Sequence, residues 1–326
     1  LMKYVHSQTV KDRINQSCEL LSKNSVAKRI AYSSFILMLL NVDLTPNELL
    51  SILQIDGLPQ SVISNEGFKD VVDLQGGRLC VRSSIFAKYI ISTLGAPEIL
   101  KYMFEINENA ECLYSEDKLR AIRSSFATYS NINLLIPLKS RSSNDNKQIL
   151  EYYYNLSQRK IYDNNPFFWL QYAIASMEVT DYNRAKELID MAYDCAKNRR
   201  NFDTFQIDTQ QGRLILEVLN KKGSSTPYID FKKAQTLFKS SSQSTRGNVR
   251  QVIKQVVKSY PQFYDKYKDV LSRKEKSEIL ESTDEFIKIA NTNNEYARKH
   301  SRPSENISSE DIRKLVKLKK AILATK

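Results

Sequence analysis

The stretch PFFWLQYAIASMEVTDYNRAKELIDMAYDCAK, residues 166–197, carries the clearest structural signal in the chain. Aromatic, aliphatic and small residues recur in it at intervals of three and four, which place side chains on one face of a helix. Thr180-Asp181 provides a turn in the middle, so the stretch predicts two antiparallel helices. The residues expected to lie between these helices are Trp169, Ala173, Tyr182, Ala185, Ile189 and Ala192.

This spacing resembles the tetratricopeptide repeat, in which a large residue at position 4 packs between two helices and small residues at positions 8, 20 and 27 let them approach. With Trp169 at position 4, the three alanines fall at the small positions, Tyr182 falls at 17 and Ile189 at 24. Ser176 and Lys197 depart from the usual Tyr and Pro. Core packing explains most of the matching residues, so functional contacts are expected on the concave surface of a stack.

Looser copies of the pattern follow. Gln206–Asn220, with Gly212 as its small residue, predicts the first helix of a second pair. Phe231, Ala234 and Phe238 repeat the 17/20/24 spacing in the second helix of that pair.

A third helix pair is expected over Val249–Tyr260 and Phe263–Leu271. Such units cannot bury their apolar faces singly, so they stack. The sequence therefore predicts a mainly α fold in which residues 146–300 form a tetratricopeptide-like α-α superhelical array.

One β signal stands out, at residues 71–82. Val71-Val-Asp-Leu74 and Arg78-Leu-Cys-Val-Arg82 flank Gln75-Gly76-Gly77, and consecutive glycines supply the positive φ values of a tight hairpin turn. Ser83 or Ser84 then caps a predicted helix from Ile85 to Leu94.

Three short helical segments are expected before this hairpin. Ser25 is the candidate cap of the first, and Thr45-Pro46-Asn-Glu48 combines a cap, a first-turn proline and a capping-box glutamate for the second. The segments are 25–40, 46–53 and 60–67. Three short helices cannot close a core alone, and a hairpin would cover the open side. Residues 25–95 are therefore predicted to form a winged helix-turn-helix domain.

The remaining segments are also predicted to be mostly helical. Residues 1–24 are expected to continue an upstream domain, because the chain begins with Leu1 inside a predicted helix. Residues 96–145 predict a helical connector that ends in a flexible polar loop, 140–146. Residues 301–326 predict a polar linker and a C-terminal basic helix, which Ser308-x-x-Asp311 would cap.

Composition argues against most catalytic chemistry. The 326 residues include two histidines, His6 and His300, and four cysteines without close pairing, which are expected as buried free thiols in a reducing cytoplasm. The longest apolar run is far shorter than the roughly 20 residues of a membrane span. Phosphate-binding glycine motifs are missing. No catalytic residue, metal site, cofactor or membrane contact is therefore predicted in this chain.

The net charge of +12 leaves a nucleic-acid contact open. Lys and Arg cluster at residues 197–200 and 313–320, which gives a candidate basic contact surface. Its members are Arg199, Arg200, Lys314, Lys317 and Lys320. In the second cluster apolar residues recur at helical spacing, so a solvated helix face is the favoured interpretation.

The order of winged helix, helical connector and repeat-like pairs resembles the C-terminal half of bacterial STAND NTPases, signalling proteins of anti-phage defence that in some cases carry a sirtuin-type NADase. Two stretches support the resemblance. Residues 78–87, RLCVRSSIFA, are similar to the entry into the last winged-domain helix, and residues 167–173, FFWLQYA, followed by 201–208, NFDTFQID, are similar to the repeat region. Ser83 stands where relatives typically have His, and Lys88 where an acid is common.

The resemblance implies a regulatory and sensing module of a cytoplasmic defence protein. An upstream domain would bind ATP or ADP, and the wing residues Arg78, Arg82 and Ser83 would contact that domain. Because Ser83 replaces a histidine that can contact ADP in relatives, its own contact with nucleotide is in doubt. The helical array would bind a foreign protein, and the activated protein would homo-oligomerise.

A second hypothesis is a winged-helix transcriptional regulator whose repeats bind an effector. Its candidate recognition helix, Gln60–Phe68, contains no Lys or Arg, although phosphate contacts dominate DNA affinity. Arg78 and Arg82 keep this alternative open. An enzyme with an unrecognised site is a third hypothesis, for which the sequence offers no residues.

Overall fold

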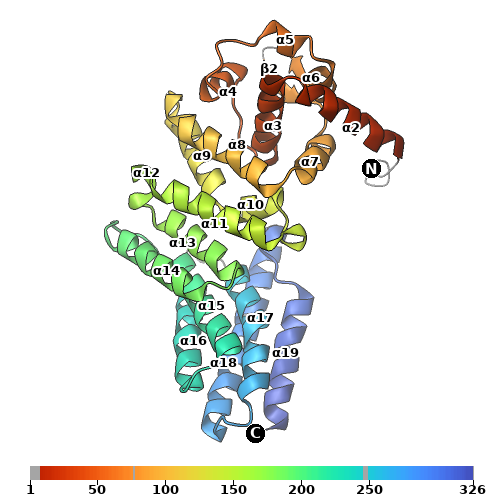
Figure 1. Ribbon diagram of the computed structural model, residues 1–326. Coiled ribbons are helices and arrows are strands. Elements are labelled where there is room, and N and C mark those ends of the chain that lie inside the picture. Colours follow the sequence, from red (N-terminus) through yellow and green to blue (C-terminus); the bar gives the residue numbers. More distant parts are fainter. Residues whose placement is uncertain (1–7, 76–77, 245–248, 326) are drawn as a thin grey trace. The chain divides into compact units, whose positions relative to one another are not determined.

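The computed structural model describes residues 8–75, 78–244 and 249–325. These residues are mainly helical, as the sequence predicts, with one two-stranded sheet among them (Figure 1). The chain divides into two compact units, Leu1–Tyr162 and Asp163–Lys326. The helix at residues 143–157, which the sequence assigned to the repeat array, lies in the first unit.

Helix α3 is the centre of the first unit. The helices α2, α6, α7 and α8 and the strand β2 all pack against it, and most of its residues are buried. The elements are α2 (Gln8–Ser22), α3 (Ser25–Leu39), α4 (Pro46–Ile52), α5 (Gln60–Ile63), α6 (Glu66–Val71), β1 (Val72–Gln75), β2 (Arg78–Val81), α7 (Ser84–Thr93), α8 (Ala96–Asn109), η1 (Ala110–Cys112), α9 (Glu116–Ala127), α10 (Tyr129–Leu135), η2 (Leu138–Ser140), α11 (Ser143–Ser157) and α12 (Lys160–Asp163).

Helix caps explain where the short helices begin. Thr45 and Glu48 form the predicted capping box of α4. Asn24, and not the expected Ser25, caps α3, because its side chain accepts hydrogen bonds from the first free amides of that helix. The predicted helix over 60–67 is instead two helices, because Asn65 ends its first part and caps α6.

The predicted hairpin is confirmed. Strands β1 and β2 are antiparallel, with Val72 opposite Val81 and Asp73 opposite Cys80. Ser83 caps α7 by accepting a hydrogen bond from the amide of Phe86. The turn residues Gly76 and Gly77 and the side chain of Arg78 lie outside the described part of the chain.

The flexible loop expected over 140–146 is wrong. Ser142 caps α11 in a capping box with Asp145, so residues 143–146 form the first turn of that helix. Arg141 is also held, because its guanidinium donates to the hydroxyl of Tyr129 and to the carbonyl of Ile136. A polar composition here reflects a helix start and not mobility.

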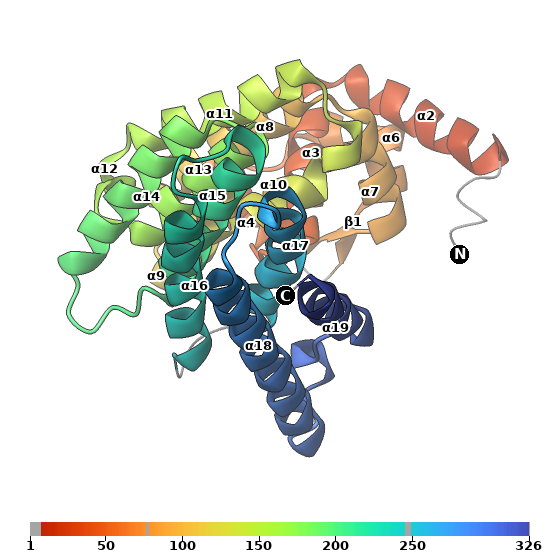
Figure 2. The ribbon, with the colours of Figure 1, turned by 90° about the horizontal axis from the view of Figure 1, so that it is seen from below.

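The second unit is a series of helices that pack on their neighbours in the chain. Its first two pairs contain α13 with α14 and α15 with α16, and α17 packs on α15, α18 and α19 (Figures 1 and 2). The elements are α13 (Pro166–Glu178), α14 (Tyr182–Lys197), α15 (Phe205–Lys222), α16 (Pro227–Gln243), α17 (Val249–Tyr267), α18 (Arg273–Lys299), η3 (Pro303–Glu305) and α19 (Ser309–Ala324).

The predicted third pair is wrong, because α17 is one helix that contains Pro261. Proline in a helix interior loses one backbone hydrogen bond and costs about 3 kcal/mol. Tyr260, Phe263 and Tyr264 are almost completely buried around it. Each such aromatic side chain contributes roughly 2–3 kcal/mol on burial, which outweighs the cost of the proline. Helix α17 packs on α15, α16, α18 and α19 and does not form a separate pair of its own.

The polar segment before α19 is anchored. Asn294 of α18 donates to the carbonyl of Ile307 and accepts from its amide, and the side chain of Ile307 is buried. Ser308 caps α19 by accepting from the amide of Asp311, as predicted. The C-terminal helix is thereby fixed on the second unit.

Candidate functional site

The residues that the sequence predicted to lie between α13 and α14 are buried in this helix pair. Trp169, Ala173, Tyr182, Ala185, Ile189 and Ala192 are all buried. The turn between the helices spans only residues 179–181. The predicted helical structure of 166–197, with Trp169 inside, is confirmed.

A carbonyl group fixes the large residue of this pair. The indole Nε1 of Trp169 donates to the backbone oxygen of Asp163 at 3.0 Å, and the thiol of Cys195 donates to the same oxygen at 3.2 Å. Trp169 comes from α13 and Cys195 from α14, so both helices are tied to the segment that precedes them.

The pair α15–α16 is closed by a glycine that faces an aromatic ring. A Cβ atom at Gly212 would lie 2.9 Å from Cε1 of Phe238, closer than real side chains pack. Phe231, Ala234 and Phe238 are completely buried. The small-against-large packing of the first pair is thus found again in the second.

We expect Gly212→Leu to lower the free energy of unfolding by about 1–3 kcal/mol, because the added side chain overpacks the space that Phe238 fills. The variant Gly212→Leu/Phe238→Ala should recover part of this loss, since the leucine then occupies the vacated volume. Urea denaturation of the wild type, Gly212→Leu, Phe238→Ala and the double variant measures the effect. Additive losses in the double variant would contradict the contact.

A charged cluster joins three helices of the second unit, and the sequence analysis missed it. Arg213 of α15 donates to Glu178 of α13 at 2.6 Å and to Glu217 of its own helix at 2.9 Å. Lys258 of α17 donates to the same oxygen of Glu217 at 2.9 Å. Arg213 and Glu217 are only 7 % and 9 % exposed. We call Glu178, Arg213, Glu217 and Lys258 the Arg213 cluster.

The charges of this cluster compensate one another. Burial acts to lower the pKa of Arg213, but the carboxylates of Glu217 and Glu178 outweigh it and raise that pKa above the ordinary arginine value. Burial likewise acts to raise the pKa of Glu217, and Arg213 and Lys258 bring it below the ordinary value. The ion pairs of the Arg213 cluster link α13, α15 and α17 and thereby fix how these helices align. Each carboxylate of the cluster accepts from a cation, so none is a free base.

The predicted basic residues divide into two kinds. Arg199 donates to the backbone oxygen of Asn164 at 2.6 Å, which gives it a structural contact. Arg200 is exposed. Lys314, Lys317 and Lys320 are exposed on α19, where Lys314 forms an ion pair with Glu310. The structure does not bring the two groups into one described contact.

In the first unit, the wing residues have local partners. Arg82 forms an ion pair with Asp73 across the hairpin at 3.7 Å, and the hydroxyl of Ser83 caps α7. Both side chains are at least partly exposed. They are therefore accessible to a neighbouring domain.

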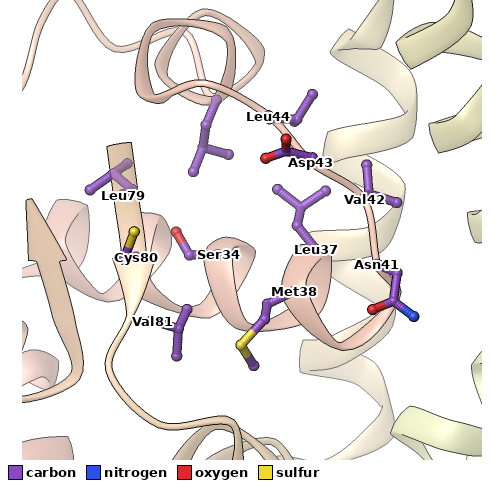
Figure 3. Close-up of a pocket in the computed structure, with 11 residues that line it drawn as sticks. Ser34, Leu37, Met38, Asn41, Val42, Asp43, Leu44, Leu79, Cys80 and Val81 are labelled. Carbon is purple, nitrogen blue, oxygen red and sulfur yellow. The ribbon is translucent and has the colours of Figure 1, made fainter. Parts of the chain in front are cut away.

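A pocket of about 510 Å³ lies beside β2 (Figure 3). It opens between the end of α3, the segment that leads to α4, and the strand β2. Seven of its eleven lining residues are aliphatic or Met, and the others are Ser34, Asn41, Asp43 and Cys80, whose thiol is free. The lining residues are Ser34, Leu37, Met38, Asn41, Val42, Asp43, Leu44, Leu49, Leu79, Cys80 and Val81. Such a lining suits an apolar side chain.

A second pocket, of about 640 Å³, lies in the second unit beside the turn between α15 and α16. Ile229 and Val270 contribute exposed apolar surface to it. Lys266, also in its lining, donates to the carbonyls of Leu219 and Asn220, so its charge is used at the end of α15.

The cysteines match the sequence prediction in part. All four are free, and Cys195 is buried, but Cys112 is exposed, contrary to expectation. It follows the end of α8 in the short helix η1, where the chain turns at the surface. Within the described ranges, no group of three His, Cys, Asp or Glu residues could hold a metal ion. None of the helices in those ranges is long and apolar enough to cross a membrane.

Searches of known proteins found no match to a protein-family model, a curated protein or a solved structure.

Proposed function

We propose that the chain is the regulatory and sensing part of a STAND-type NTPase in anti-phage defence, and that it binds a protein trigger on its helical second unit. The main support is that two successive helix pairs pack in the same way, with small residues facing large ones. In α13–α14 these are the alanines and Trp169, and in α15–α16 they are Gly212 and Phe238. Repeated pairs of this kind stack into extended surfaces that bind proteins. On this proposal the second unit is a tetratricopeptide-like array.

In this proposal the first unit holds the upstream nucleotide-binding domain in an inactive state. We propose that residues 25–95 are a winged-helix domain that packs on an upstream nucleotide-binding domain. The pocket beside β2 could receive an apolar side chain of that domain, while Arg82 and Ser83 border the strand and its following helix. A trigger that binds one state better than the other would then shift the equilibrium between restrained and active protein.

Phage challenge tests this proposal. Cells that carry the complete gene are infected with a phage panel, and escape phages are sequenced. The phage protein in which escape mutations fall is then titrated calorimetrically into the 326-residue chain. We expect saturable binding that the escape mutations weaken. Escape mutations in a protein that shows no binding to this chain would contradict the proposed sensor.

The complete gene provides a second test. We expect the coding sequence in front of the codon for Leu1 to contain Gly-x-x-x-x-Gly-Lys-Ser/Thr, because STAND proteins bind nucleotide through such a phosphate loop. A complete gene without any phosphate loop would contradict membership of the STAND group.

A winged-helix transcriptional regulator is the alternative, and the structure gives one observation against it. The face of α6 that contains Gly67 packs closely on α2, where a Cβ atom at Gly67 would lie 2.4 Å from the carbonyl oxygen of Ser17. Asp70 of the same helix accepts a hydrogen bond from Ser17. A helix that is held on this side and carries two acids and one lysine is a poor reader of DNA. Sequence-selective binding of a duplex in a gel shift would favour the alternative.

A further inference from the structure

The excess positive charge of the protein is confined to its last third. Residues 221–326 contain 24 Lys or Arg and 12 Asp or Glu, whereas residues 1–220 contain 25 of each. The whole formal charge of +12 therefore belongs to the part of the chain that forms α16 to α19 and the last two residues of α15. A charge concentrated in this way creates a local positive potential.

Part of this charge is neutralised by ion pairs, including that of Lys319 on α19. Lys232, Lys239 and Lys319 form ion pairs with acids of α18. The exposed face of α19 instead carries four cations at spacings of one, four and seven residues, namely Arg313, Lys314, Lys317 and Lys320. We call them the α19 basic face. Of these four, only Lys314 has an ion pair among the described residues, with Glu310, and that pair is half exposed. Exposed pairs of this kind are weak.

The other residues of α19 indicate which class of molecule binds the α19 basic face. Its apolar side, with Leu315, Leu318 and Ile322, is buried in the core of the second unit. The helix therefore has no free apolar face to insert into a lipid surface. It also contains no aromatic residue, and lysine is depleted in protein–protein interfaces, where aromatic and arginine side chains dominate. These features favour a phosphate backbone over a membrane or a protein.

The length of the face fits a nucleic-acid strand. Arg313 and Lys320 are seven residues apart, which corresponds to about 10 Å along a helix. Four cations spread over this length, on long flexible side chains, can reach a short run of neighbouring phosphates on one strand. Without aromatic side chains for base stacking, such contacts depend on charge and not on sequence.

We propose that the α19 basic face binds the phosphodiester backbone of nucleic acid without sequence preference. The residues of this site belong neither to the helix pairs α13–α14 and α15–α16 nor to the helix α6 that a transcriptional regulator would use. The contact would hold the protein on nucleic acid during sensing.

Fluorescence anisotropy of the full chain tests the proposal. The probes are a labelled 20-base-pair DNA duplex, its sequence-shuffled copy, an RNA duplex and a single strand, each titrated at several salt concentrations. For about four phosphate contacts, the logarithm of the affinity should fall with the logarithm of the salt concentration with a slope of about −3.5. The two DNA duplexes should bind equally, and comparison of DNA with RNA identifies the preferred backbone.

A matched pair of variants locates the site. Arg313→Gln/Lys317→Gln/Lys320→Gln should reduce duplex affinity at least tenfold at 50 mM salt, and should bring the slope to about −1. The control Lys186→Gln/Lys197→Gln/Arg200→Gln removes the same charge from exposed residues of α14 and the turn after it, and should change affinity less than threefold. Circular dichroism checks that both variants keep their helices.

Several outcomes would overturn the proposal. These are no duplex binding at 50 mM salt, equal losses in the two triple variants, and preference for one duplex sequence. Tighter binding of polyglutamate would indicate an acidic protein partner, and binding of phosphatidylserine vesicles without duplex binding would indicate a membrane. None of these results depends on the trigger of the sensor, so the two proposals fail separately.

Discussion

Trp169→Ala should lower the free energy of unfolding of residues 163–326 by about 3–5 kcal/mol, which is among the largest effects expected from a single substitution. The indole of Trp169, on α13, is buried. Its Nε1 donates to the backbone oxygen of Asp163. Removal leaves a large cavity, and the oxygen of Asp163 keeps only the weak thiol donor of Cys195. Urea denaturation followed by circular dichroism measures the loss.

Phe167→Ala is the matched control. Phe167 is two positions earlier in the same helix and 42 % exposed, with its ring against Phe202. Its removal should cost only about 1–2 kcal/mol, because a large part of its surface stays in water on folding and no hydrogen bond is lost. Similar losses for the two variants would mean that Trp169 is not the residue that closes the pair.

Arg213→Ala should lower the free energy of unfolding by about 3–5 kcal/mol, because it removes one of the two ion-pair partners that the buried carboxylate of Glu217 has in the described part of the chain. Replacing both residues, as in Arg213→Met/Glu217→Leu, should cost much less than Arg213→Ala, since no buried charge is left unpaired. Lys258→Ala is the control, because the side chain of Lys258 is exposed. It should lower the free energy of unfolding by about 1 kcal/mol or less. Chemical denaturation at pH 7 compares the three variants.

The same cluster predicts a dependence of stability on pH. The pKa of Glu217 in the folded protein is below its ordinary value of 4.5, because Arg213 and Lys258 stabilise the carboxylate. The contribution of this carboxylate is therefore complete above about pH 4.5 and is lost as the pH falls through the lower, folded-state pKa. The stability difference between the wild type and Glu217→Gln should be constant from pH 5 to 7 and shrink below pH 4.5. A difference that grows on acidification would contradict this assignment.

Local signals predicted several elements of this fold. The spacing of Trp169 and three alanines identified α13 and α14, and the capping box at Thr45 and the paired glycines of the hairpin identified α4 and the two strands. Each of these signals is encoded within a few residues, so it can be interpreted without knowledge of distant neighbours.

Two of the errors arise because a tertiary contact decided the local structure. Pro261 predicted a helix end, but the aromatic residues around it are buried in the core and keep α17 continuous. A break between Ile63 and Glu66 was not predicted, because Asn65 also donates from its side chain to Leu20 of α2, which lies 45 residues earlier in the chain. The capping box at Ser142 is a local signal that the polar composition of 140–146 obscured.

The Arg213 cluster could be found only in three dimensions. Its four residues come from three helices, and only Arg213 and Glu217, four residues apart after Gly212, give a signal within one helix. That signal resembles an ordinary exposed ion pair. Burial distinguishes the two cases, and burial depends on how α13, α15 and α17 pack. The α19 basic face, in contrast, was visible in the sequence as a charge cluster.

Amide hydrogen exchange of the full chain tests most directly whether α13 and α14 are locked together. The packing around Trp169 predicts slow exchange in the interior of residues 166–197, with both helices opening as one unit, and Trp169→Ala should accelerate exchange in α14 as well as in α13. Rapid exchange throughout residues 166–197 in the wild type, or an α14 whose exchange is unchanged in Trp169→Ala, would contradict this account.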